Sequence, residues 1–323
     1  MSEQLRSVVS ADFNAVNQFV IDQLYSEVEL VESIGHYIVD AGGKRLRPLL
    51  VLLTAKACGI KTDQHIPMAA VIEFIHTATL LHDDVVDMST LRRGRPTVNA
   101  AWNTPSSVLV GDFIYSRAFQ VLVSIGNLSI MEIMANTTNK IAEGEVLQLL
   151  AKSNPQPNER DYMRVIENKT AILFKAAAEC GAILANAEAA TAEALARFGM
   201  HVGTAFQLID DVLDYQGEAE AMGKNLGDDL AEGKSTLPLL FAMTHCSADE
   251  KVLTRACLTA ESPNAEQLQQ VIKIVLKSGG IAYTLDKAEQ QATQAKACLS
   301  LLPDSRYRET LDQMVDFALH RSN

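Results

Sequence analysis

One acidic pattern occurs twice in this chain, and it constrains the fold more than any other feature. LLHDDVVDM spans residues 80–88 and QLIDDVLDY spans residues 207–215. In both segments a pair of aspartates and a third aspartate follow a long apolar run, so carboxylates four residues apart share one helix face. Two such helices facing each other would gather up to six carboxylates around one cavity. Such a cavity is unfavourable unless a cation neutralises it.

Magnesium is the cation that suits this pattern. Hard divalent ions prefer oxygen ligands and keep water molecules that a phosphate oxygen can replace. We therefore predict a site for Mg²⁺ ions bound to a polyphosphate. A single acidic cluster at a helix end is more often a solvated surface, and only the recurrence of the motif favours a metal site.

The composition and the apolar periodicity predict an all-α protein. Apolar residues make up 48% of the 323 residues and aromatic residues 6%, a balance that favours helices over a sandwich or barrel. No stretch of strand-like alternation has a convincing length. We predict a single domain over residues 1–323, a bundle of roughly ten or more helices around a central cavity. Apolar residues recur at helical spacing in the segments 10–40, 48–59, 67–87, 106–125, 129–151, 162–185 and 191–215.

The charge and the cysteines limit the compartment and the partners. A net charge of -12 argues against a nucleic-acid surface or an anionic-membrane surface. The chain starts without signal-peptide features, and no run of 18 uncharged apolar residues suggests a membrane span. We expect a cytoplasmic protein without stable membrane insertion. Five scattered cysteines, expected to be reduced core residues, are Cys58, Cys180, Cys246, Cys257 and Cys298.

Basic residues gather next to helix ends and acidic motifs, which indicates specific anionic ligands. Arginine presents a planar fork that matches phosphate oxygens, and lysine supplies a point charge. Each cluster alone is also compatible with a solvated surface. Together they predict two anionic groups, one bound through metal and one bound directly by basic side chains. The clusters are Lys44, Arg45 and Arg47 after two glycines, Arg92, Arg93 and Arg95 after the first acidic motif, and Lys224 and Lys234 after the second.

Four polar residues interrupt otherwise apolar helical segments: His76, Lys169, Thr170 and Gln207. His76 precedes Asp83 by seven residues, two helical turns on about the same face. A buried polar group without a partner costs about 1–3 kcal/mol, so each of these residues requires one. A ligand is one candidate partner, and another core residue is the other.

The motifs in their order resemble a known family. GGKRLRP, LLHDDVVDMSTLRRGRPT, VGDFIYSRAF, KTAILF, FQLIDDVLDY and GKNLGDDLAEGKSTLP follow one another within residues 34–240. Together they resemble the all-trans polyprenyl diphosphate synthases, and within them the long-chain, octaprenyl-forming bacterial branch. The resemblance implies an isoprenoid synthase fold, a homodimer and two or three Mg²⁺ ions. It also implies a prenyltransferase that repeatedly condenses isopentenyl diphosphate onto an allylic diphosphate, farnesyl diphosphate, to supply a quinone side chain.

The resemblance also implies a role for individual residues. Isopentenyl diphosphate would be held without metal by Lys44, Arg47, His76 and Arg93. The Mg²⁺ ligands would be Asp83, Asp87 and Asp210, supported by Asp84, Asp211 and Asp214. The allylic diphosphate would contact Arg92, Lys169, Thr170, Gln207, Lys224 and Lys234. The catalytic residues would be Lys169, Thr170 and Gln207, and residues 216–235 would close as a lid that excludes water.

Product length has its own candidates. Ala78 lies about one turn before Asp83, where short-chain members of the family carry bulky aromatic residues. We expect the growing chain to pass Ala78 into a tunnel between helices, with its floor near Leu122 and Met134. Close helix packing is the other explanation for a small residue at Ala78.

Other functions compatible with the acidic motifs are a different product length, a related terpenoid enzyme and a non-catalytic subunit. Products from hexaprenyl to nonaprenyl remain open. A terpene cyclase or a head-to-head synthase also uses Asp-rich metal sites but needs no isopentenyl diphosphate pocket, so GGKRLRP and His76 count against it. A non-catalytic subunit of a heteromeric synthase would be expected to have lost motif residues, and both acidic motifs are intact.

Overall fold

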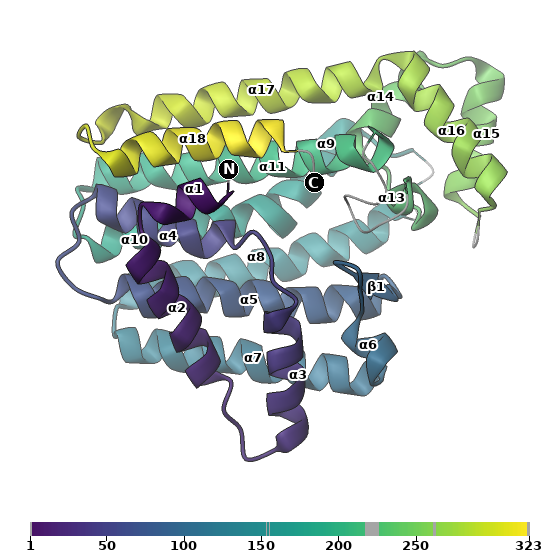
Figure 1. The fold of residues 1–323 in the computed structure, drawn as a ribbon. Helices are drawn as coiled ribbons and strands as arrows, with labels where there is room; N and C mark the ends of the chain where they lie inside the picture. Colours follow the sequence, from purple (N-terminus) through teal and green to yellow (C-terminus); the bar gives the residue numbers. More distant parts are fainter. Residues whose placement is uncertain (1, 153, 155, 217–225, 261–262, 322–323) are drawn as a thin grey trace. The chain divides into compact units, whose positions relative to one another are not determined.

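The computed structural model describes residues 2–152, 154, 156–216, 226–260 and 263–321, and this part of the chain is helical almost throughout (Figure 1). The prediction of an all-α fold is confirmed. One short antiparallel pair joins β1 (Leu91–Arg92) and β2 (Arg95–Pro96). The helices are α1 (Ser2–Ser7), α2 (Ser10–Gln23), α3 (Glu29–Asp40), α4 (Leu46–Ala57), α5 (His65–Val86), α6 (Val98–Ala101), α7 (Thr104–Ile125), α8 (Leu128–Lys152), α9 (Glu159–Ile166), the π-helix η1 (Glu167–Ala171), α10 (Ile172–Leu184), α11 (Ala189–Gln216), α13 (Asp228–Ala231), α14 (Leu237–His245), α15 (Ala248–Leu258), α16 (Ala265–Ser278), α17 (Gly280–Cys298), the 3₁₀-helix η2 (Leu299–Leu301) and α18 (Arg306–His320).

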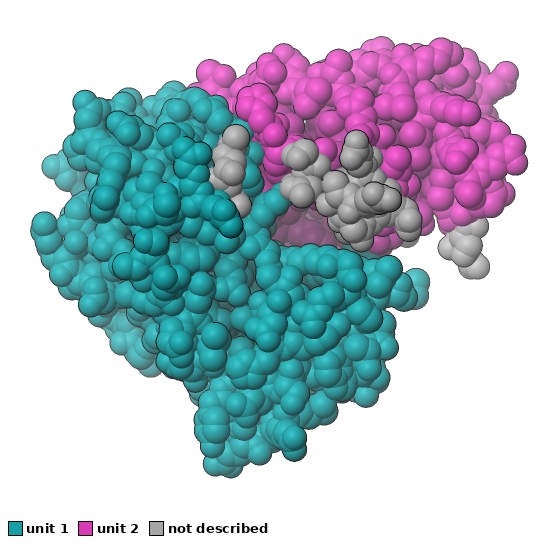
Figure 2. All heavy atoms as spheres, viewed as in Figure 1, with its two compact units in different colours: residues 1–138, 173–199, 295–317 teal, residues 139–172, 200–294, 318–323 magenta. Residues whose placement is uncertain are grey.

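The chain divides into two compact units, each built from three chain segments (Figure 2). Unit 1 contains residues 1–138, 173–199 and 295–317. Unit 2 contains residues 139–172, 200–294 and 318–323. The first acidic motif (residues 80–88) therefore belongs to unit 1 and the second (residues 207–215) to unit 2. A single domain over residues 1–323 stays a prediction.

Helix α5 is the buried centre of unit 1. It packs against α2, α4 and α7, and the side chains of Ile72, Phe74 and Ile75 are buried, as its near-continuous apolarity predicts. The sequence predicted that this helix opens at Pro67, but it begins two residues earlier, at His65. Proline is tolerated in the first turn of a helix, where its missing N–H has no partner to lose, so it does not mark the first residue.

A π-helical turn interrupts the segment that the sequence predicted as one continuous helix over residues 162–185. The segment forms α9, η1 and α10, and the turn η1 carries Lys169 and Thr170. Gly144 of α8 permits the close approach, because a Cβ at that position would lie 2.8 Å from the backbone nitrogen of Lys169. Single π-turns inside α-helices frequently occur at functional sites.

Helix α7 is long and apolar for a helix of modest burial. Among the described helices it alone passes a length and composition test for a membrane span, a test that core helices of soluble proteins also pass. Only 39% of its most apolar 18-residue window is buried within the chain. All five cysteines are free thiols. Cys180 and Cys257 are buried, as predicted, whereas Cys58, Cys246 and Cys298 are only partly buried and the prediction that they are core residues was wrong for them.

Candidate active site

The first acidic motif lies at the C-terminal end of α5, in unit 1. Asp83 and Asp87 are half-buried, whereas Asp84 is 1% exposed. The buried carboxylate of Asp84 binds Arg92: Nε donates to Oδ1 at 2.9 Å, and Nη2 lies 2.7 Å from the same oxygen. The three carboxylates therefore divide into two that solvent reaches and one committed to a neighbouring guanidinium.

A two-residue turn in the β1–β2 hairpin directs consecutive arginines to different partners. Arg93 and Gly94 both have positive φ, 53° and 72°, as a tight type I′ hairpin requires. Arg92, just before the turn, reaches Asp84 of the acidic motif. The guanidinium of Arg93 instead donates to the carbonyl of Gly42 and packs against Gly43, where a Cβ would lie 2.7 Å from Nη2. The hairpin, which the sequence did not predict, thus contacts both the acidic motif and the basic loop (residues 42–45).

Within the basic loop, Arg45 is turned toward the interior of unit 1. It adopts a left-handed backbone conformation (φ 45°), donates to Asn17 and to the carbonyl of Val39, and lies 3.6 Å from Oε1 of Glu73. Glu73, on α5, is 9% exposed and was not singled out in the sequence. Burial raises the pKa of Glu73, and the nearby guanidinium of Arg45 opposes that shift. A lone acidic residue in an apolar helix was the signal for this buried ion pair.

His76 and Arg47 lie together, as their predicted shared role requires. Nη1 of Arg47 is 3.3 Å from Nε2 of His76, and its guanidinium lies 4.4 Å from the centre of the Phe174 ring. Because arginine can only donate, Nε2 of His76 accepts and the imidazole is neutral. Burial, with the charges of Arg47, Arg93 and Arg92, holds the pKa of His76 well below its usual value.

The second acidic motif, in unit 2, repeats the division seen in the first. Asp210 is exposed, and its Oδ1 lies 2.8 Å from Nη2 of Arg321. Asp211 is 2% exposed and accepts hydrogen bonds from Tyr162 at 2.5 Å and from Gln207 at 2.9 Å. Burial, together with the charge of Asp229, raises the pKa of Asp211 to about 8. In both motifs the first aspartate of the pair is accessible and the second is bonded inside its own unit.

The polar residues in the middle of the helical segments of unit 2 form hydrogen bonds or ion pairs. The hydroxyl of Thr170 donates to Oε1 of Gln207 at 3.1 Å, so the predicted pair is in direct contact. Nζ of Lys169 lies 2.8 Å from Oε2 of Glu145, an acidic residue on α8 that was not among the predicted site residues. Thr170, Gln207 and Asp211 therefore form one hydrogen-bonded chain between η1 and the end of α11, and the Lys169–Glu145 pair lies in the same turn as Thr170.

The charged loop after α11 supplies a further acidic residue. Nζ of Lys234 lies 2.5 Å from Oε2 of Glu232 and 3.6 Å from Oδ1 of Asp229. The backbone N–H of Asp229 in turn lies 3.5 Å from Oδ1 of Asp214. Asp229 was not among the predicted site residues, although GDDLAEGK contains an aspartate pair. Lys224 and much of the predicted lid lie outside the described residues.

The carboxylates suit a magnesium diphosphate better than a bare ion. Within the described residues, no three His, Cys, Asp or Glu side chains gather closely enough to hold a metal alone. Mg²⁺ is usually bound by one or two carboxylates and completes its octahedron with water and phosphate oxygens. Asp83 and Asp87, one turn apart and partly accessible, provide such a donor pair. In unit 2, Asp210 is paired with the guanidinium of Arg321.

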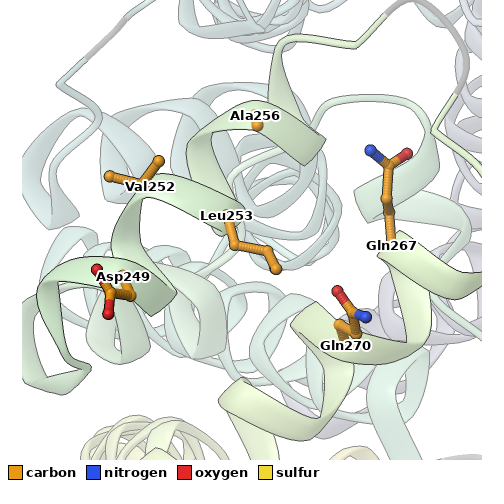
Figure 3. A pocket seen from close by; sticks show the side chains of 6 residues that line it. All are labelled: Asp249, Val252, Leu253, Ala256, Gln267 and Gln270. Atoms are coloured by element: carbon orange, nitrogen blue, oxygen red, sulfur yellow. The ribbon is translucent and has the colours of Figure 1, made fainter.

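A separate depression in unit 2 contains none of the predicted site residues. It lies between α15 and α16 (Figure 3) and is lined by Asp249, Val252, Leu253, Ala256, Gln267 and Gln270. Its polar groups do not converge on one point, so we assign it no chemistry.

The helical fold and the paired acidic motifs define an all-α enzyme that acts on isoprenyl diphosphates. The sequence model of the family described as "Polyprenyl synthetase" matches residues 28–275, and the chain belongs to this family. It is a prenyltransferase that repeatedly condenses isopentenyl diphosphate onto an allylic diphosphate to form long all-trans polyprenyl diphosphates, as predicted. The family uses a divalent metal ion.

Individual relatives are similar over nearly the whole chain. The octaprenyl diphosphate synthase of Escherichia coli K12 is 47% identical over 99% of this chain and 98% of its own length. An all-trans-nonaprenyl-diphosphate synthase (geranyl-diphosphate specific) of Rhodobacter capsulatus is 46% identical over the same shares. The crystal structure of a polyprenyl synthase from Caulobacter crescentus, complexed with calcium and isoprenyl diphosphate, has a TM-score of 0.97 and 40% identity. The similarity between the two structures covers 100% of this chain and 98% of the chain from Caulobacter crescentus.

Proposed function

We propose that this enzyme extends farnesyl diphosphate with isopentenyl diphosphate to octaprenyl diphosphate, for a quinone side chain, using two or three Mg²⁺ ions. The observation that carries the proposal is the β1–β2 hairpin, whose consecutive residues Arg92 and Arg93 contact an acidic and a basic cluster. Neighbouring clusters of opposite charge suit two diphosphates, one bound through metal and one bound directly. The 47% identity to an octaprenyl diphosphate synthase supports the product. Five free thiols support a cytoplasmic location.

The proposed roles follow from the contacts within each unit. Lys44, Arg47, His76 and Arg93 hold isopentenyl diphosphate, with His76 orienting Arg47 through its hydrogen bond. Asp83, Asp87 and Asp210 hold magnesium, which when bound neutralises the allylic diphosphate and stabilises its departure. Asp84 positions Arg92 next to the acidic motif. Lys169, Lys224, Lys234 and Arg92 are the proposed cationic contacts of the allylic diphosphate.

Thr170 and Gln207 are the proposed residues nearest the reacting carbon. As the allylic carbon–oxygen bond ionises, positive charge develops on that carbon. The oxygens of the Thr170 hydroxyl and the Gln207 amide stabilise this charge electrostatically, without forming a bond to it. Their mutual hydrogen bond fixes both groups before the substrate arrives. The double bond of isopentenyl diphosphate then attacks the carbon, and loss of a proton to the released diphosphate completes one addition.

The proposed reaction is tested by incubating the enzyme with farnesyl diphosphate, labelled isopentenyl diphosphate and Mg²⁺. We expect chromatography of the dephosphorylated products to show octaprenol as the main species, and chelation of the metal to stop elongation. A main product of nonaprenol would correct the chain length only. Elongation that persists without divalent metal would contradict the magnesium role, and cyclic products would favour a terpene cyclase.

We also propose a homodimer formed through α7 and the start of α8. Leu109 and Val123 are each 65% exposed on α7, an apolar helix that its own chain covers poorly, and Leu128, the first residue of α8, is 82% exposed. Burying these side chains against a second copy would remove them from water. We expect light scattering to give twice the mass of the chain, and Leu109→Glu with Val123→Glu to give the monomer. A monomeric parent protein would contradict the proposal.

A further inference from the structure

Three consecutive backbone carbonyls of the basic loop are bound by arginines. The carbonyl of Gly42 accepts from Arg93, whereas those of Gly43 and Lys44 both accept from Nη2 of Arg6, at 2.9 and 2.5 Å. A carbonyl oxygen carries partial negative charge and repels a diphosphate that approaches it. The guanidinium groups of Arg93 and Arg6 bind these three oxygens, which offsets their partial negative charge. The same hydrogen bonds determine the path of the backbone at Lys44.

Arg6 comes from a part of the chain that precedes the residues matched by the family model. That match begins at residue 28, and Arg6 lies in the last turn of α1. The apolar side chain beside it, Leu5, is 1% exposed, and Val9 is 4% exposed, so both anchor this short segment in the core of unit 1. The guanidinium of Arg6 also lies 4.9 Å from the centre of the Phe13 ring. The buried neighbours of Arg6 and its contact with Phe13 therefore fix the position from which its guanidinium reaches the basic loop.

The loop depends on outside support because its conformation is intrinsically unfavourable. Gly42, Gly43 and Arg45 have φ values of 72°, 141° and 45°. Arg45 has a Cβ, so this left-handed conformation is strained and requires contacts that hold it. Hydrogen bonds from a charged donor are stronger than neutral ones, and the two from Arg6 flank the Lys44 position.

We infer that Arg6 is a positioning residue for the binding of isopentenyl diphosphate. Arg6 fixes the backbone on either side of Lys44, so that the ammonium group of Lys44 contacts the diphosphate that is bound without metal. The inference rests on the proposed role of the basic loop. It extends that site to α1, where Arg6 contributes to substrate binding from outside the residues that the family model matches.

The test compares Arg6→Gln with Arg117→Gln, a matched control in the same unit. Arg117 likewise lies over a phenylalanine ring (Phe113, 5.1 Å) and donates to a distant carbonyl (Tyr25, 3.3 Å). We expect Arg6→Gln to raise the KM for isopentenyl diphosphate about ten-fold. The KM for farnesyl diphosphate and kcat should change less than about two-fold. Arg6→Lys, which keeps a charged donor, should recover part of the loss, and Arg117→Gln should leave all three constants near those of the parent.

A binding measurement without metal separates positioning from general stability. Calorimetric titration with isopentenyl diphosphate in chelator should show weaker binding for Arg6→Gln only. Equal losses for both substrates, or losses that follow the melting temperature in both variants, would overturn the positioning role. If Lys44→Gln weakens binding and Arg6→Gln does not, the inference about Arg6 alone is wrong. If Lys44→Gln has no effect, the proposed role of the loop is wrong and that of Arg6 falls with it.

Discussion

Replacing Asp83 with alanine is expected to abolish condensation, reducing kcat by about 10³-fold or more. Asp83 and Asp87 lie one turn apart at the end of α5 and remain partly accessible, whereas Asp84 is committed to Arg92. Removing Asp83 takes away one of the two carboxylates of this pair, so the magnesium that neutralises the diphosphate would be held more weakly and out of position. Initial rates with farnesyl and isopentenyl diphosphates over a range of Mg²⁺ concentrations measure the effect.

The stability of the same variant distinguishes a metal ligand from a structural residue. Asp83 and Asp87 are like charges at i and i+4, and losing one removes a repulsion of about 0.2–0.5 kcal/mol from the helix. Thermal melting in chelator should therefore show only a small change in melting temperature, whereas condensation is lost. Asp63→Ala, an exposed aspartate just before the opposite end of α5, is the matched control and should keep the parent rate. Near-normal condensation by Asp83→Ala would contradict the metal assignment.

Replacing Ala78 with tyrosine is expected to shorten the product to about three or four isoprene units, since Ala78 lies only about 7.5 Å along α5 from Asp83. Ala78 is fully buried, and so are the two predicted floor residues, Leu122 and Met134, at 1% and 0% exposure. All three belong to unit 1. A phenol ring at position 78 would block the proposed tunnel near its mouth. Chromatography of the dephosphorylated products measures the chain length.

A control on the same helix separates blockage from overpacking. Ala69 is also fully buried, and nine residues of α-helix place it on the opposite face from Ala78. Ala69→Tyr should destabilise the protein by about 1–3 kcal/mol without changing the length of what is made. Ala78→Leu, a smaller obstruction, should give intermediate products. An unchanged product distribution in both Ala78 variants would contradict the tunnel, and close packing would then explain the alanine.

The helices and the motif order could be predicted from the sequence because both depend on local patterns. The apolar repeat of α5 and the composition favour helix over strand at each position independently of the rest of the chain. The boundary at Pro67 was two residues late, and the single helix predicted over residues 162–185 contains a π-turn. The turn depends on the space beside Gly144, a tertiary contact that no local pattern reports.

The partners of the charged residues could not be predicted in the same way. Arg45 stands between Lys44 and Arg47 in the sequence, yet its left-handed backbone turns it inward, toward Glu73. Arg6 and Glu145 had no motif to mark them, because their importance comes from what they touch 37 and 24 residues away. Asp229 carried a recognisable signal, an aspartate pair, but its contact with Asp214 depends on how the loop folds back.

The sequence by itself determined the class of protein, since the recurrence of DDxxD on two apolar helices and the basic segments between them specify charged ligands of opposite sign. Only the tertiary structure decided which aspartate of each pair is more exposed: Asp83 and Asp210 remain accessible to solvent, while Asp84 and Asp211 are buried and bonded to Arg92 and to Tyr162. The reason is that helical periodicity places adjacent residues about 100° apart, so one member of each pair must turn toward the interior. Which member turns inward depends on the partners that the fold brings to it.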